Sequence, residues 1–147
     1  MTGAVICGID ESVSAPGAAR VARELATRFE VPLVFVHVLA EGHTEADVRA
    51  AAELLRDADT SWAPGAGAQR LIEAGHPADR LVALASAQRA TFVVLGCHGP
   101  RSSLLGSISA DVSRRARCPV MIVPPDALPQ LAALTTASFR PIQPAPA

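Results

Sequence analysis

The 147-residue sequence contains neither lysine nor tyrosine, and aromatic residues make up only 3% of it. All 13 basic residues are therefore arginines. Without lysine the chain can have neither a Schiff-base lysine nor the lysine of a Walker-type phosphate loop, which excludes several enzyme classes. Because half of the residues are hydrophobic while few are aromatic, we expect a core of Val, Ile, Leu and Ala, as in a helix-covered parallel sheet.

Charge of one sign does not dominate either, because 13 basic residues balance 14 acidic ones and leave a net charge of −1. This balance gives no field that would attract nucleic acid, and no long basic run suggests such a partner. No apolar run approaches the roughly 18 residues of a membrane span, and no leader pattern is seen. Three widely spaced cysteines, Cys7, Cys97 and Cys118, fit free thiols better than a disulfide framework. We therefore expect a soluble cytoplasmic protein without a membrane partner.

Short β-branched runs alternate with longer alanine-rich stretches. Four continuous apolar runs and a fifth, weaker one predict strands at Ala4–Ile9, Val31–Leu39, Gln69–Glu73, Phe92–Leu95 and Val120–Val123. Continuous rather than alternating runs indicate strands buried on both faces of a parallel sheet. Helical spacing predicts a helix with Pro16 in its first turn and further helices at Glu45–Ala58, Ala78–Gln88 and Ser107–Arg117, with Ser107 as the N-cap of the last.

This order of strands and helices predicts an α/β fold, a doubly wound, mostly parallel five-stranded sheet with helices on both faces. We place the domain at residues 1–124. Six of the twelve prolines fall in the last 24 residues, and no periodic segment remains there. Residues 125–147 are therefore interpreted as a Pro/Ala-rich, mostly disordered tail.

In open α/β sheets, ligands bind beyond the carboxyl ends of the strands, where the strand order reverses. Three sequence features fall at such ends: Gly8–Asp10, the His37–Val38 pair and the loop Gly96–Ser107. A second interpretation of Asp10 is that it serves only as a turn residue at the entry to a helix.

The loop after the fourth strand has the physical properties of a phosphate site. Gly96 and Gly99 permit close backbone approach, so successive N–H groups can face an anion. Gly106 and Ser107 then begin a helix whose N-terminal N–H groups favour phosphate, and Arg101 can add a positive charge. The alternative is an ordinary strand–loop–helix connection with turn glycines, since short glycine patterns are common.

Other candidate chemistry has less support. His98 has no serine or cysteine nucleophile paired with it by a recognisable motif. Cys7, Cys97 and His98 match no zinc spacing, so we assign no metal site and interpret Cys7 as a small core residue. His37 lies within an apolar strand and is interpreted as a hydrogen-bonded core histidine rather than a ligand. The arginines at 114, 115 and 117 are interpreted as a solvated helix end.

Five segments, in the same order, resemble the universal stress protein family: Val5–Ser12, Val36–Val38, Gly75–Pro77, the glycine loop with its Gly106–Ser107 pair, and Cys118–Val123. The resemblance runs from about Ala4 to Val123. It implies a regulatory role in the stress response rather than enzyme activity beyond a weak, incidental ATPase. It also implies a homodimer in which Val120–Val123 pairs with its twin.

The resemblance further implies a ligand, namely ATP, with or without Mg²⁺, or another adenine nucleotide. Carried over by position, Asp10 after Gly8 contacts the adenine or its sugar, and backbone near Val38 meets the base. The ribose and phosphates fall on the remaining matched positions, which are Gly96, Gly99, Gly106, Ser107 and the N–H of Ile108.

Two departures from the family's ATP-binding pattern bear on this expectation. Only six residues separate Gly99 from Gly106, three fewer than in that pattern, which leaves fewer N–H groups around a triphosphate. Glu11 stands where the family has glycine, and Ala15 where it has serine, with Ser14 displaced by one. The alternative hypothesis is therefore a universal stress protein that does not bind ATP and acts through protein partners.

Overall fold

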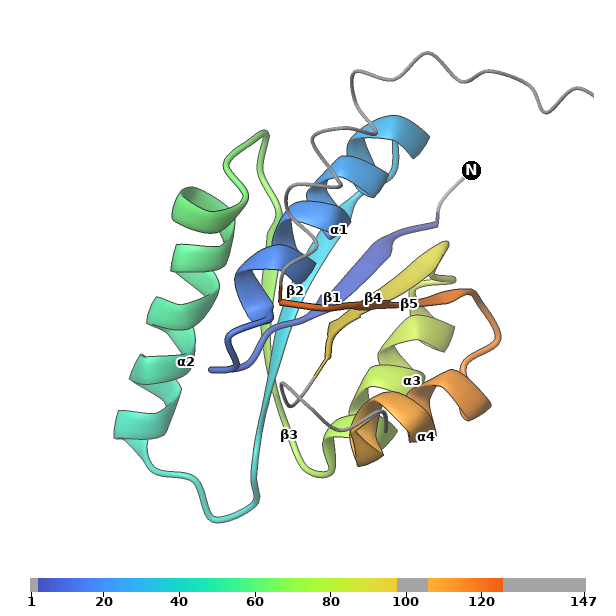
Figure 1. The fold of residues 1–147 in the computed structure, drawn as a ribbon. Coiled ribbons are helices and arrows are strands. Elements are labelled where there is room, and N and C mark those ends of the chain that lie inside the picture. The colour runs from blue at the N-terminus through green and yellow to red at the C-terminus, as the bar shows by residue number, and fades with distance from the viewer. Residues whose placement is uncertain (1–2, 98–105, 126–147) are drawn as a thin grey trace, which may run out of the picture.

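The computed structural model describes residues 3–97 and 106–125, which form a five-stranded parallel sheet covered by helices (Figure 1). The strands are β1 (Val5–Gly8), β2 (Leu33–Leu39), β3 (Gln69–Ala74), β4 (Phe92–Gly96) and β5 (Val120–Val123). The helices are α1 (Ala15–Phe29), α2 (Glu45–Asp57), α3 (Pro77–Ala87) and α4 (Ser107–Arg115), with a single π-turn at Ala58–Trp62. No helix among these described residues has the length and apolar character needed to cross a membrane.

The strand order is β3-β2-β1-β4-β5, and every neighbouring pair is parallel. From β1 the chain first moves outward through β2 to β3 and then returns to place β4 on the other side of β1. The order therefore reverses between β1 and β4, which is the point where doubly wound sheets bind their ligands.

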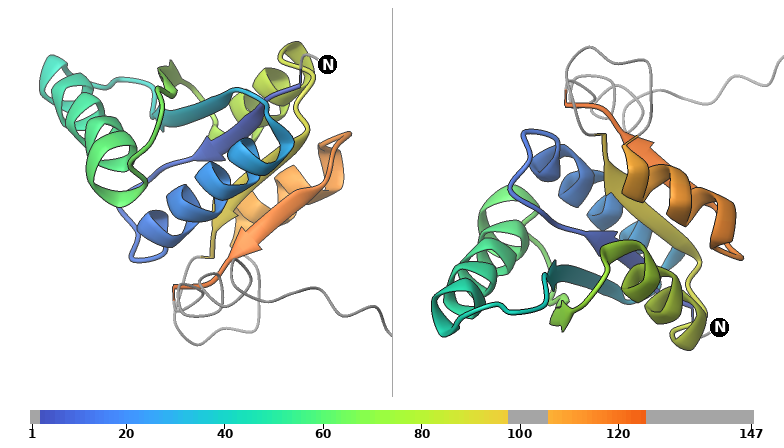
Figure 2. Two further views of the ribbon diagram at one scale, coloured as in Figure 1. Left: turned by 90° about the horizontal axis from the view of Figure 1, so that it is seen from above. Right: turned by 90° about the horizontal axis from the view of Figure 1, so that it is seen from below.

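Two separate apolar clusters show which helices cover which face of the sheet (Figure 2). On one face Cys7 and Phe35 pack with α1 and with Leu55 of α2. On the other face Ile6 and Val36 pack with α3 and α4. Because β1, β2 and β4 lie between helices on both faces, most of their residues are buried, as the continuous apolar runs predicted.

Helix α4 begins differently from the prediction, whereas α1 has Pro16 in its first turn, as predicted. Gly106, not Ser107, occupies the N-cap of α4, and Ser107 is its first helical residue. The predicted Ser107 cap is therefore wrong, and α4 ends at Arg115 because Ala116 has extended backbone. Ser14 occupies the N-cap of α1 but makes no side-chain capping bond. The predicted loop residues 98–105 and tail residues 126–147 lie outside the described part of the chain.

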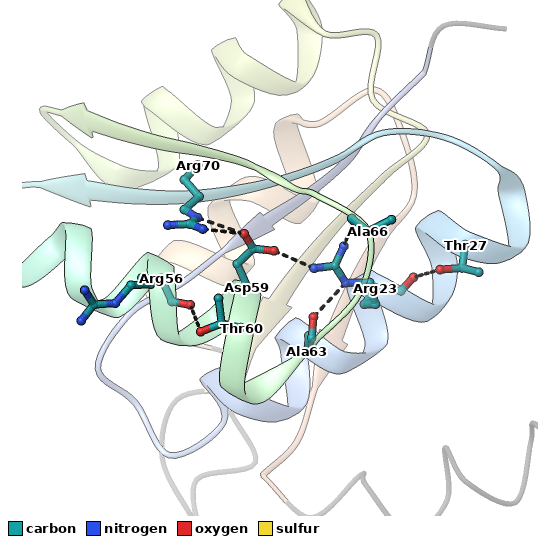
Figure 3. Close-up of polar contacts among 8 residues, drawn as sticks. All are labelled: Arg23, Thr27, Arg56, Asp59, Thr60, Ala63, Ala66 and Arg70. Carbon is teal, nitrogen blue, oxygen red and sulfur yellow. Dashed lines mark hydrogen bonds and ion pairs between the residues drawn. The ribbon is translucent and has the colours of Figure 1, made fainter.

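A buried carboxylate fastens the connection between α2 and β3 to the rest of the domain (Figure 3). Asp59 accepts from Arg23 of α1 at 2.8 Å and from Arg70 of β3 at 2.9 Å, and its side chain is only 9% exposed. Arg23 also donates to the carbonyls of Ala63 and Ala66. One carboxylate and two guanidiniums thus join α1, the π-turn and β3.

Candidate functional site

A pocket of about 100 Å³ opens at the carboxyl ends of β1, β2 and β4, on the sheet face covered by α3 and α4. Residues from five elements or their adjoining turns line it: Gly8, Ile9, Asp10, Val36, His37, Val38, Pro77, Leu81, Leu95, Gly96, Ile108 and Ser109. The pocket lies at the reversal between β1 and β4, so the fold brings together the ends that the sequence marked as candidates.

Five of the predicted site residues line this pocket: Gly8, Asp10, Val38, Gly96 and Ile108. Gly106 and Ser107 do not line the pocket. They begin helix α4, and the next residue of that helix, Ile108, does line it. The predicted contacts of Gly99 and Arg101 fall outside the described residues.

Sequence reasoning missed the part of the pocket contributed by α3. Pro77 and Leu81 come from the first turns of that helix, and Leu95 comes from the strand before the glycine loop. Leu81 is almost fully buried and belongs to the core cluster on the α3 and α4 face. No local pattern distinguishes such a residue from any other core leucine, because its role depends on where the helix crosses the sheet.

Gly8 leaves space in the pocket because it has no side chain. A Cβ at this position would lie 2.7 Å from Cδ2 of Leu95, which is closer than real Cβ contacts come. A side chain at residue 8 would therefore displace Leu95 or fill the pocket. The close packing explains why glycine stands at the end of this buried strand.

Asp10 occupies the turn that follows β1, and its carboxylate shapes that turn. Oδ1 accepts a hydrogen bond from the backbone N–H of Ser12 at 2.9 Å, an Asx-turn arrangement. Burial, with a smaller contribution from the Asp10 charge, raises the pKa of the Cys7 thiol far above its ordinary value. Cys7 is therefore un-ionised and acts as a packing residue, as the sequence suggested.

His37 forms a wall of the pocket. Its Nδ1 lies 2.7 Å from the carbonyl oxygen of Ile9, and because that oxygen can only accept, Nδ1 carries the proton. The predicted hydrogen bond of a core histidine is confirmed. The ring is nevertheless only half-buried, and it lines both this pocket and an outer groove next to α2.

The pocket combines apolar walls with a few directed polar groups. Val36, Val38, Leu81, Leu95 and Ile108 supply the apolar surface. The N-terminal end of α4 adds backbone N–H groups that, as at the start of any helix, have no partner within the helix itself. Such a site suits a flat, mostly apolar group joined to an anion. Among the described residues no group of three or more His, Cys, Asp or Glu side chains is placed to hold a metal ion.

Fold and pocket together define a doubly wound α/β domain with a pocket at the topological switch point. The chain belongs to the universal stress protein family, whose family model matches residues 1–124.

Two curated universal stress proteins of Mycobacterium tuberculosis strains are each 43% identical to the chain over 77 residues. The match covers 48% of this chain and 52% of each relative. The chain thus spans about half the length of these curated relatives.

Solved structures of the family superpose well on the chain. A universal stress protein from Archaeoglobus fulgidus has a TM-score of 0.70 at 28% identity, over 84% of this chain and 99% of that one. A universal stress protein in complex with cAMP gives 0.69 at 30% identity, over 82% and 96%. The Archaeoglobus fulgidus protein in complex with dAMP gives 0.68 at 27% identity, over 84% and 99%.

Proposed function

We propose that the chain is a regulatory module of the stress response that binds an adenine nucleotide in the switch-point pocket. The observation that carries this proposal is the convergence of Gly8, Asp10, Val38, Gly96 and Ile108 on one pocket, although they come from four separate parts of the sequence. Similar proteins in complex with cAMP and dAMP support the same ligand class.

Each part of the pocket has a role in this proposal. The apolar side chains of Val36, Val38 and Leu81 take the adenine ring, and the backbone near Val38 meets its polar edge. The carboxylate of Asp10 accepts from the sugar hydroxyls or the adenine amino group. The N–H groups at the start of α4 receive the phosphate, favoured by the positive end of the helix dipole.

The proposed role is binding rather than catalysis, beyond at most a weak, incidental ATPase. Nucleophilic catalysis needs an activated nucleophile next to a base. Within the described pocket lining, Ser109 is the sole hydroxyl, and the hydrogen bond recorded for the His37 ring joins it to a backbone carbonyl. The pocket therefore suits a regulatory module that binds nucleotide in the cytoplasm and responds by changing its contacts with other proteins.

A specific observation favours the alternative, a family member that does not bind ATP and acts through protein partners. Only six residues separate Gly99 from Gly106. A short connection offers fewer N–H groups to the phosphates of a nucleotide. The nucleotide-binding proposal therefore predicts that a nucleotide with one phosphate binds at least as tightly as ATP. Mg²⁺ then has little effect, because bridging of adjacent phosphates is what it contributes.

Homodimerisation through β5 belongs to the same proposal. β5 pairs with β4 on one side only and forms an edge of the sheet. Met121 on this strand is 37% exposed, and edge strands with apolar side chains are usually covered. A second copy related by two-fold symmetry, the commonest arrangement of oligomers, would cover it. Sedimentation velocity at micromolar concentration tests it, and a purely monomeric protein contradicts it.

Calorimetric titration with AMP, cAMP, ADP and ATP, each with and without Mg²⁺, tests the nucleotide proposal. A dissociation constant of about 10 μM corresponds to roughly −7 kcal/mol and is readily measured. GMP serves as the matched control ligand for AMP, since the two differ only in the base. Absence of binding by every adenine nucleotide contradicts the proposal and favours the alternative.

A further inference from the structure

A second concave site lies at the opposite end of the sheet from the switch-point pocket. Helices α3 and α4 each lead from the carboxyl end of one strand to the amino end of the next, so their last residues lie near the start of β4 and β5. A groove of about 460 Å³ opens there, with three arginines among its lining residues: Arg89, Arg115 and Arg117. We call it the arginine groove. No Asp or Glu is among the described residues that line it.

One of the three arginines is fixed by partners of its own. Arg115 donates to Asp79 at 2.7 Å and to Asp111 at 3.0 Å. These hydrogen bonds raise the pKa of the Arg115 guanidinium, and they tie the end of α4 to the start of α3. Arg115 therefore holds the two helices that form the groove but contributes little net charge to it.

The other two arginines are available to a ligand. Within residues 3–97 and 106–125, the side chains of Arg89 and Arg117 make neither a hydrogen bond nor an ion pair, and both residues are exposed. Each guanidinium presents five N–H donors and stays charged at all physiological pH values. The groove thus contains two positive charges that the described fold does not neutralise.

The backbone at Arg89 strengthens this interpretation. Arg89 has a φ of 49°, a left-handed conformation that follows α3 and that glycine adopts most readily. The N–H groups of Arg89 and Ala90 already donate to the carbonyls of Ser86 and Ala85, so the helix end needs no side-chain cap. An arginine here has an unfavourable backbone conformation and no capping role, which points to a function for its side chain.

The rest of the lining is mostly apolar. It consists of Val82, Ala85 and Ser86 of α3, Ala90 after that helix, and Cys118 before β5. We propose that the arginine groove binds an acidic segment of a partner protein. Carboxylates of this segment pair with Arg89 and Arg117 through bidentate hydrogen bonds, and an aliphatic side chain of the segment packs on Val82 and Ala85. A polyanion such as nucleic acid fits less well, because the chain carries a net charge of −1 and two free cations form no extended track.

Fluorescence anisotropy tests the proposal with a short labelled peptide of glutamate and leucine and the full-length chain. Arg89→Gly removes the guanidinium and suits the left-handed backbone, so it preserves the fold, and Arg117→Ala is the second variant. We expect each to weaken peptide binding at least about tenfold, because each removes at least one charge-assisted hydrogen bond. Arg49→Ala is the matched control, because Arg49 is an exposed arginine on α2 without a side-chain bond in the described structure, and it leaves binding unchanged.

Three results would overturn the proposal. The first is no saturable binding of the peptide at low salt, or equal binding when its glutamates are replaced by glutamine. The second is an equal loss in Arg49→Ala, which would indicate attraction to net positive charge anywhere on the surface. The third is that a labelled DNA duplex or an anionic vesicle binds more tightly than the peptide and depends on the same two arginines. Calorimetry with adenine nucleotides gives the same affinity in Arg89→Gly as in the parent, since the two sites lie at opposite ends of the sheet.

Discussion

Ser14 and Gly96 lie so close together that a Cβ on Gly96 would overlap the Ser14 hydroxyl. Ser14 is only 1% exposed, and its Oγ is hydrogen-bonded to the Oγ of Ser12 at 3.0 Å. Ser12 in turn donates its backbone N–H to Asp10. Ser12 and Ser14 therefore connect the turn that carries Asp10 to the strand end at Gly96, and both Asp10 and Gly96 line the pocket.

Gly96→Ala should disturb this connection, because the added methyl group must displace Ser14. We expect a loss of about 1–3 kcal/mol in the free energy of unfolding, as for other overpacked sites, together with weaker nucleotide binding. Denaturant unfolding and calorimetry measure the two effects. Adding Ser14→Gly to this variant removes the overlap and should restore most of the stability; a double variant no more stable than Gly96→Ala would show that the contact is not the cause.

Asp10→Asn separates the charge of this residue from its turn. Asparagine keeps an oxygen that accepts from the Ser12 N–H, so the free energy of unfolding should change by less than about 0.5 kcal/mol. Nucleotide affinity should fall roughly tenfold, because a charge-assisted hydrogen bond to the ligand becomes a neutral one. Glu11→Gln is the control, since Glu11 is exposed and does not line the pocket. Equal affinity in Asp10→Asn and the parent would remove Asp10 from the site.

Asp59→Ala should be the most destabilising of these substitutions. It leaves Arg23, whose side chain is 13% exposed, and Arg70 without their shared carboxylate. Breaking a buried ion pair costs about 3–5 kcal/mol, and the partial exposure of Arg70 places the expected loss near 3 kcal/mol. Urea unfolding measures it, with the exposed Asp57→Ala as the control. Nucleotide affinity should be unchanged; a loss equal to that of Asp57→Ala would mean that the cluster does not stabilise the domain.

The contact between α3 and α4 should weaken in acid. The Arg115 guanidinium, which donates a hydrogen bond to Asp79, holds the pKa of that carboxyl below its ordinary value. Because the folded form has the lower pKa, the stabilisation is fully present above the unfolded pKa of about 4 and is lost as the pH falls further. Thermal unfolding of Asp79→Asn should therefore depend less on pH between about 5 and 3 than that of the parent. Identical pH profiles would contradict this assignment.

The strands were the most predictable part of the fold, and the reason is burial. β1, β2 and β4 lie between helices, so their apolar runs are continuous. β3 gave a weaker pattern because it is an edge strand on which no residue is fully buried. The π-turn at Ala58–Trp62 was not predicted, since the Asp59 cluster that holds it joins residues distant in the sequence.

The candidate site was predictable to the extent that its residues follow strands. Gly8, Asp10, Val38 and Gly96 stand at strand ends, and parallel strands bring such ends together at one edge of the sheet. Leu81 of α3 could not be predicted, because its position depends on how that helix packs. Ser107 was misassigned as a cap because Gly106 and Ser107 both suit that position, and only the backbone geometry distinguishes them.

The central claim is that adenine nucleotide binds at the reversal between β1 and β4, and the most direct measurement is a two-dimensional amide NMR titration with AMP. The predicted result is saturable shifts of the backbone amides of Gly8, Asp10, Val38, Gly96 and Ile108. Arg89 and Ala90, at the far end of the sheet, serve as internal controls and keep their positions. Shifts at the far end alone, or no saturable shifts at the five pocket amides, would contradict the claim.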